Sequence, residues 1–394
     1  MLHDPIVILA AKRTPMGGFQ GDFATLTASD LGAVAIRAAV AEASLAPERI
    51  EGGIIGNVLM AGQGQAPARQ AILKAGLPEA THAATVNKMC GSGMQAVMDA
   101  HDRLIAGSAD ILLAGGMESM TNAPYLLAKA RGGLRMGHGE IKDSMFLDGL
   151  EDAYEPGRLM GSFADETARD YQFTRGAQDG YALESLRRAK AAIENGAFTA
   201  EIAPVAVPGK TGELLVAIDE QPGKARPEKI PTLKPAFAKD GTVTAANASS
   251  ISDGAAALIL TRAGHAEQHG LVPLARIVGH ATHAAAPAKF STAPIGAIGK
   301  LFARTGWTRD DVDLFEINEA FAVVAMAAIR DLGLDHAKVN IHGGATALGH
   351  PIGASGARIL VTLLAALKAK GLKRGVASLC IGGGEATAMA VELL

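Results

Sequence analysis

The feature that most constrains the fold is an alternation of short apolar runs with segments of helical periodicity. It occupies the first third of the chain and resumes after about residue 250. Strands separated by helices of this length predict βαβ crossovers and a mostly parallel sheet covered by helices on both faces. In each half a glycine-rich turn opens a long helix, and the apolar strand that follows runs into Gly115–Gly116 or Gly382–Gly384. This similarity suggests that one βαβ domain is duplicated.

The middle of the chain interrupts this alternation. Between about 120 and 250, Gly, Pro and charged residues become frequent, and we expect one helix over 175–195 with Thr174 as N-cap. A chain of 394 residues exceeds the usual span of one hydrophobic core. We therefore expect three parts. These are an N-terminal half at 1–120, completed by about 245–270, an inserted loop or lid domain at 121–245, and a C-terminal half at 271–394.

Composition excludes several classes of protein. The formal net charge of −3 leaves no general basic surface, so we expect no nucleic-acid partner. No stretch approaches the roughly 20 uninterrupted apolar residues of a membrane span, and the Ala-rich run 320–329 is interpreted as a core helix. The first apolar run, Ile6–Leu9, begins too early for a signal peptide to precede it, which predicts a cytoplasmic protein.

The chain has only two cysteines, and both stand among glycines. An arbitrary free cysteine is most often an inert core residue. Cys90, however, lies at a predicted turn between a strand and a helix, where backbone N–H groups and the helix dipole favour the thiolate. Cys90 is therefore a candidate nucleophile. Cys380 follows the apolar strand 376–379 and precedes a glycine run, where backbone can approach a substrate closely.

Two further positions carry candidate chemistry. His350 lies in the glycine-dense loop 343–353 beside Pro351, a setting that leaves room for a bulky ligand and suits a catalytic base. Asn318 follows the apolar strand 314–317, where an isolated Asn would more often be a plain N-cap. A phosphate-binding loop and a metal site are both weak alternatives, because no Walker or Gly-x-Gly-x-x-Gly motif and no Cys/His cluster at ligand spacing is present.

These four places, in this order, resemble the thiolase family over nearly the whole chain. The resemblance implies a duplicated α/β thiolase fold with five layers, α-β-α-β-α, and an inserted loop domain. The matching stretches are Lys12–Pro15, Gly56–Leu59, Pro67–Gln70, Val86–Gly93, Gly115–Met120, Gly241–Ser249, Asn318–Phe321, Gly343–Gly353 and Cys380–Gly384.

The resemblance implies a reversible Claisen exchange between acyl-CoA molecules, with CoA as substrate and no tightly bound cofactor. Cys90 would take an acyl group with His350 as base, and Cys380 would remove the α-proton of acetyl-CoA. Asn318 would hold a water that forms one oxyanion hole with His350. The backbone N–H groups of Cys90 and Gly382 would form the other hole, where one good donor is worth roughly 3 kcal/mol.

Contacts to CoA and to an ion follow by the same resemblance. The expected CoA contacts are Ser249, Lys224, Lys229, Met160, Phe321 and Tyr181. Many short-chain members carry His where this sequence has Leu159. The mitochondrial-type short-chain branch, which also accepts 2-methylacetoacetyl-CoA, binds potassium at positions matching Tyr181, Ala245, Ala246, Ala248 and Thr346.

Other functions stay open on the sequence. A thiolase of broader chain length and a non-catalytic acyl-CoA carrier of the same fold are alternatives. A ketoacyl-synthase-like enzyme would lack the second reactive cysteine, so Cys380 argues against it. The family is normally a homodimer or homotetramer, and the glycine-rich segment 130–140 would be the tetramer-forming loop.

Overall fold

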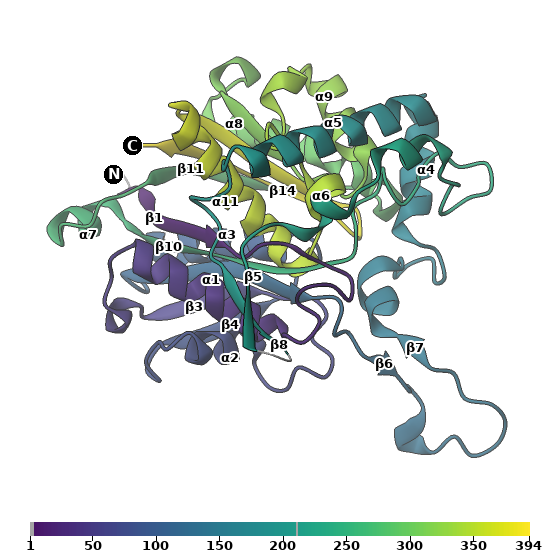
Figure 1. Ribbon diagram of the computed structural model, residues 1–394. Coiled ribbons are helices and arrows are strands. Elements are labelled where there is room, and N and C mark those ends of the chain that lie inside the picture. Colours follow the sequence, from purple (N-terminus) through teal and green to yellow (C-terminus); the bar gives the residue numbers. More distant parts are fainter. Residues whose placement is uncertain (1–3, 210–211) are drawn as a thin grey trace.

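One large mixed sheet organises the molecule (Figure 1). The computed structural model describes residues 4–209 and 212–394. Within them ten strands form this sheet, and β2 (Gly17–Gly18) pairs with β10 beside the main path. The order along that path is β12 (Leu314–Ile317), β13 (Arg374–Ile381), β14 (Glu385–Leu393), β11 (Ala275–Ala284), β1 (Ile6–Arg13), β10 (Ser252–Arg262), β5 (Ile111–Ser119), β3 (Gly52–Gly56) and β4 (His82–Val86).

The prediction of a mostly parallel sheet is wrong. Strand β3 is parallel to β4 and β5, and β12 is parallel to β13, as the βαβ pattern requires. Every other pairing on the path is antiparallel. The reason is clearest at β14, which returns from β13 through Gly382–Gly384, a turn far too short for a parallel crossover. Gly383 and Gly384 have φ of 92° and 87°, which favours glycine.

Helices divide the sheet into layers, which agrees with the expected α-β-α-β-α architecture. Helices α3 and α11 pack against each other between the two halves of the sheet, and the largest buried cluster joins them to both halves (Figure 1). Outer helices cover the remaining faces. The layers comprise α1 (Ala28–Glu42) and α2 (Pro67–Lys74) outside the N-terminal half, α3 (Ser92–Ile105) and α11 (Ile352–Lys370) in the centre, and α8 (Ala293–Thr305) and α9 (Ala322–Leu332) outside the C-terminal half.

The two central helices touch backbone to backbone. A Cβ added to Gly93 would lie 2.7 Å from the Ala357 nitrogen, and one added to Gly356 would lie 2.4 Å from the Met94 nitrogen. No side chain fits at such distances, so these glycines are what allows the close approach. The first turns of α3 and α11 consequently lie side by side, and the residues just before them, Cys90 and His350, are brought into one region.

Helix α11 bears on the expectation that the chain has no membrane span. Among the described residues it alone is long and apolar enough to span a membrane by length and composition, whereas the sequence analysis considered only 320–329. Its apolar window is 83% buried inside the fold. Because α11 lies between the two halves of the sheet, its apolar surface packs against protein on both sides, as in the core helix of a large domain.

The inserted segment contains more regular structure than expected. The predicted helix over 175–195 is α5 (Arg175–Glu194), and the Thr174 hydroxyl accepts from the Ala177 N–H as its N-cap. The other elements there are β6 (Tyr125–Leu126), β7 (Lys142–Asp143), α4 (Met160–Asp170), β8 (Val205–Gly209), β9 (Gly212–Val216) and α6 (Glu220–Lys224), and α7 (Ala263–Gln268) and α10 (Ala345–Leu348) complete the helices. The limits of the three expected parts stay predictions.

Candidate active site

A strained turn presents Cys90 between β4 and α3. The residue before it, Met89, has φ of 48°, a left-handed conformation that costs a non-glycine residue roughly 1–2 kcal/mol. Local hydrogen bonds hold this conformation. The Asn87 side chain accepts from the Met89 N–H at 3.0 Å, and the Ser92 hydroxyl donates to the Met89 carbonyl at 2.6 Å. The thiol is thereby fixed at the start of α3, as the sequence predicted.

The environment of the Cys90 sulfur contradicts the expectation of a favoured thiolate. Burial is the largest influence and raises the pKa of Cys90 to about 11. The backbone N–H groups of Gly382 and of Cys90 itself lower the pKa in part, whereas the charge of Glu118 raises it further. Desolvation outweighs the nearby N–H groups, so at neutral pH the resting side chain is a thiol that needs a base.

His350 has the geometry of that base. Its Nδ1 lies 2.6 Å from the Ser355 hydroxyl, which in turn donates to the Pro351 carbonyl at 3.0 Å. Since the hydroxyl proton is used there, Ser355 accepts the proton of Nδ1, and Nε2 carries a free lone pair. Nε2 is buried and has no protein partner. Burial, followed by the charge of Arg358, lowers the pKa of His350 to about 3, so the imidazole is neutral.

Cys380 is the second sulfur near this point. It lies at the end of β13, is 1% exposed and packs in a cluster with Phe163, Phe290 and Phe321. Burial raises its pKa well above the usual value, and the next largest cause is the charge of Cys90. Cys90 and Cys380 are 290 positions apart in the sequence, and Gly382, two residues after Cys380, lines the same cavity as Cys90. The convergence of both sulfurs on one point stays a prediction.

Asn318 is not the N-cap of a helix. Helix α9 begins at Ala322 with Phe321 as its N-cap, which excludes the simpler interpretation of this residue. The Asn318 side chain is 1% exposed, its Oδ1 accepts from Arg358 at 3.5 Å, and its Nδ2 has no protein partner. A buried amide donor without a partner is costly unless a water or ligand atom satisfies it.

One cavity connects these groups. It has a volume of about 400 Å³, and Cys90, His350 and Gly382 line it. Most of the expected acyl and pantetheine contacts line the same cavity, so the structure brings them together with the thiol and the imidazole. These residues are Met160, Ser249 and Phe321, and Leu159 lines the cavity with them. Cys380 and Asn318 are buried beside them and do not form part of the described lining.

A second cavity, of about 290 Å³, adjoins the first. Ala245 and Ser250 line both. Lys224 and Lys229 line the second, where Lys224 also forms an ion pair with Glu220. The expected nucleotide contacts are thus next to the main cavity and supply positive charge.

The positions expected to bind potassium divide between these places. Ala245, Ala246 and Thr346 line the second cavity, whereas Ala248 lines the first. In the described structure Tyr181 lines neither of these two cavities, and its hydroxyl donates to Glu319 at 2.9 Å. The Thr346 hydroxyl donates to the same carboxylate at 2.6 Å. Both side chains therefore serve a buried carboxylate that the sequence analysis did not single out.

Glu118 is another functional candidate that the sequence analysis missed. Its carboxylate accepts from the backbone N–H groups of Val58, Leu59 and Gly353 at 2.9–3.2 Å and from the Asn57 amide at 2.7 Å. It therefore joins the loop after β3 to the first turn of α11. Burial raises the pKa of Glu118 to about 7. The available signal was an acidic residue inside the glycine-rich, apolar run 111–119.

Comparisons with known proteins agree over the full length. The family model described as "Thiolase, N-terminal domain" matches residues 6–264, and "Thiolase, C-terminal domain" matches residues 271–393. An acetyl-CoA acetyltransferase of Escherichia coli is 50% identical over 390 residues, 98% of this chain and 99% of that protein.

Two solved structures have the same fold. The Bacillus anthracis acetyl-CoA acetyltransferase has a TM-score of 0.97 at 40% identity, covering 100% of this chain and 99% of that one. The Acat5 thiolase from Ascaris suum, in complex with coenzyme A, has a TM-score of 0.94 at 42% identity, covering 99% and 100%.

Proposed function

We propose that this chain, which belongs to the thiolase family, is an acetyl-CoA C-acetyltransferase. It converts two acetyl-CoA molecules into acetoacetyl-CoA and CoA, and it catalyses the reverse thiolysis. The observation that carries the proposal is the shared cavity, in which the Cys90 thiol, the free Nε2 of His350 and the Gly382 N–H meet.

In the first half-reaction the Cys90 sulfur attacks the thioester carbonyl of acetyl-CoA. His350 Nε2 takes the thiol proton and then delivers it to the sulfur of the departing CoA. Oxyanion charge develops on the carbonyl oxygen, where the N–H groups of Cys90 and Gly382 stabilise it. The product is an acetyl group on Cys90 and free CoA.

In the second half-reaction His350 Nε2 takes the proton of Cys380, and the Cys380 thiolate then removes an α-proton from another acetyl-CoA. The enolate oxygen accepts from the protonated His350 Nε2 and from a water held by the Asn318 Nδ2, and the carbanion attacks the acetyl carbon on Cys90. The bond between that carbon and the Cys90 sulfur breaks, the sulfur regains a proton from Cys380, His350 returns its proton to Cys380, and acetoacetyl-CoA leaves. The unpartnered, buried Nδ2 and Nε2 support this arrangement, because both require a polar partner that substrate and water supply.

CoA occupies both cavities. Met160 and Phe321 line the acyl and pantetheine part, Ser249 lies along it, and Lys224 and Lys229 attract the phosphates at the nucleotide end. Leu159 makes one wall of the main cavity apolar.

A trapping experiment tests the assignment. Purified protein is mixed with acetyl-CoA and quenched in acid, and mass spectrometry of proteolytic peptides should find one acetyl group on Cys90, together with stoichiometric CoA release. Acetoacetyl-CoA plus CoA should give two acetyl-CoA. A Cys90→Ala control should neither become acetylated nor convert acetoacetyl-CoA and CoA into acetyl-CoA. If the wild type carries no acetyl group and consumes no acetoacetyl-CoA, the chain is a carrier and the proposal fails.

Potassium assistance is a separate proposal. The lining of one cavity by Ala245, Ala246 and Thr346 supports it, because three of the expected ion-binding positions lie on one cavity. Rate and CoA affinity should fall when Na⁺ replaces K⁺ at constant ionic strength. If both are unchanged, the ion has no role.

We also propose a homotetramer located in the cytoplasm. The hairpin of β6 and β7 projects from the body of the molecule and exposes Tyr125 (69%), Met136 (96%) and Ile141 (69%) (Figure 1). Apolar side chains at a loop tip favour contact with another subunit. Light scattering should give the mass of four 40.3 kDa chains for the wild type and half that mass for Met136→Asp, with Val272→Asp, also exposed, as control.

The proposed location follows from the state of the thiols. Both cysteines are free, and the proposed reaction needs both reduced, as reducing compartments keep them. Fractionation of the source cells with an antibody to the chain should find it with cytoplasmic markers.

A further inference from the structure

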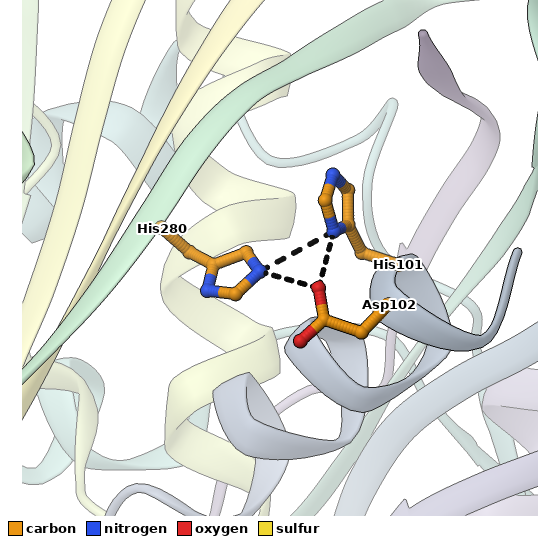
Figure 2. Close-up of side chains that lie close together, drawn as sticks. All are labelled: His101, Asp102 and His280. Carbon is orange, nitrogen blue, oxygen red and sulfur yellow. Dashed lines mark hydrogen bonds and ion pairs between the residues drawn. The ribbon is translucent and has the colours of Figure 1, made fainter. Parts of the chain in front are cut away.

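Two imidazoles and a carboxylate converge at the end of α3 that is remote from Cys90. His101 and Asp102 lie in the last turns of α3, and His280 lies on β11 of the other half of the sheet. His101 Nδ1 is 2.8 Å from Asp102 Oδ1, His280 Nε2 is 3.0 Å from the same oxygen, and the two nitrogens are 3.3 Å apart (Figure 2). Figure 2 shows all three atoms directed at a common point.

These separations suit ligands of a single metal ion. Zinc binds imidazole nitrogen and carboxylate oxygen at about 2.0–2.2 Å, so two ligands of one ion lie roughly 3.0 Å apart in octahedral and 3.4 Å apart in tetrahedral geometry. The observed 2.8, 3.0 and 3.3 Å are close to this range. An ion above the triangle of the three atoms would reach each of them without a large movement of the chain.

The surroundings favour a cation with a water ligand. The side chains of His101 and His280 are 17% and 14% exposed, whereas that of Asp102 is 64% exposed. The imidazoles are thus held by the fold, and the solvent side stays open for water as a further ligand. Two nitrogens and one carboxylate oxygen suit the borderline divalent cations.

We propose that His101, Asp102 and His280 form a binding site for a divalent transition cation of the zinc class. The ion bridges α3 and β11 and thereby braces the two halves of the molecule. It stabilises the fold and takes no part in the reaction. The rise of about 1.5 Å per helical residue places His101 roughly 14 Å along α3 from Ser92, too far for contact with a substrate at Cys90.

Metal uptake by tag-free protein tests the site. After EDTA treatment, the protein is dialysed against Zn²⁺ and its metal content measured. We compare the wild type with His280→Asn and Asp102→Asn. The matched control is His265→Asn, because His265 also has a second imidazole and a carboxylate nearby: it stacks on His269, and its Nδ1 lies 3.9 Å from Asp110 Oδ1, farther than two ligands of one zinc ion. The wild type and the control should each retain one more Zn²⁺ per chain than His280→Asn or Asp102→Asn. The affinity of these two site variants for Zn²⁺ should be at least about 10-fold lower than that of the wild type.

Two further measurements separate this site from the cysteines and from misfolding. Co²⁺ bound at His101, Asp102 and His280 should show ligand-field bands without a thiolate charge-transfer band. Zn²⁺ should raise the Tm of the wild type and of His265→Asn and leave that of His280→Asn unchanged. Circular dichroism and thiolysis in EDTA check the folding of each variant, and Asp102→Asn, at an exposed position, provides the test if His280→Asn does not fold.

Either of two results would overturn the proposal. The first is equal uptake of zinc by the wild type and both site variants, and the second is no uptake by the wild type at micromolar Zn²⁺. In both cases the cluster is only a carboxylate that accepts hydrogen bonds from two imidazoles.

Discussion

Replacement of Ser355 by alanine tests how the fold prepares the base. Ser355 is fully buried, accepts from His350 Nδ1 at 2.6 Å and gives its own proton to the Pro351 carbonyl. Without the hydroxyl, the Nδ1 proton loses its acceptor inside the protein, which costs about 1–3 kcal/mol. The tautomer with the proton on Nε2 then competes, and in that form His350 cannot accept the proton of Cys90.

The expected consequence is a slower acylation step. Since about 1.4 kcal/mol corresponds to a factor of 10, a cost of about 1–3 kcal/mol lowers the rate of the CoA burst after mixing with acetyl-CoA roughly 5- to 140-fold. KM should change little, because Ser355 does not line the described cavity that holds the substrate. Ser144→Ala is the matched control, since the Ser144 hydroxyl is also buried but has no partner in the protein.

The rate of the CoA burst is measured by rapid quench for the wild type and both variants, and a thermal melt of each variant checks that it is folded. A burst in Ser355→Ala within twofold of the wild type would refute the argument that Ser355 sets the tautomer. A rise of KM at constant kcat would refute it as well, since it would place Ser355 in binding.

The remaining predictions concern the thiols, the pH dependence of stability and a buried ion pair. Cys90→Ala should abolish the acetyl-enzyme, whereas Cys380→Ser should still acylate and fail to condense; equal loss of both half-reactions in each variant would contradict the division of labour. Burial lowers the pKa of His342 to about 4, so its stabilising contribution is complete above about pH 6.5 and is lost as pH falls toward 4. Between pH 6.5 and pH 4, the free energy of unfolding from urea melts should therefore fall by about 3 kcal/mol less in His342→Phe than in the wild type. Equal losses in the two proteins would contradict this prediction. Arg13→Ala should lower the free energy of unfolding by about 3–5 kcal/mol, because it leaves the buried carboxylates of Glu201 and Asp219 without their cation; a loss below 1 kcal/mol in the same assay would show that water replaces the guanidinium.

The features that could be predicted from the sequence are those that residues close together in the chain determine. Helix α5 begins after Thr174 because that hydroxyl caps it, and Cys90 lies at a turn before a helix because the apolar pattern changes period there. The order of strands and helices in both halves follows from the same signals. The candidate residues Cys90 and His350 were found because each stands in an unusual glycine-rich context, whereas Gly382 was implied by the family resemblance. The structure places all three on one cavity.

Features that depend on distant residues were not accessible in this way. The direction of β14 could have been inferred from the short Gly382–Gly384 turn, but its pairing with β11 joins segments about 110 positions apart. Ser355 and Arg358 resemble ordinary helical residues in the sequence of α11. Their roles follow only from the position of the His350 ring and the Asn318 amide after folding.

The Cys90 thiol illustrates why local context alone gave the wrong protonation state. Its position before α3 was predicted correctly, and the N–H groups that lower its pKa are present. The folded surroundings of the thiol also remove water from it, and desolvation then exceeds what those dipoles supply. The contact of α3 with α11 at Gly93 and Gly356 brings the first turns of both helices together, and His350 lines the same cavity as Cys90. A chain that kept the turn but lost this contact would lose the imidazole that activates the thiol.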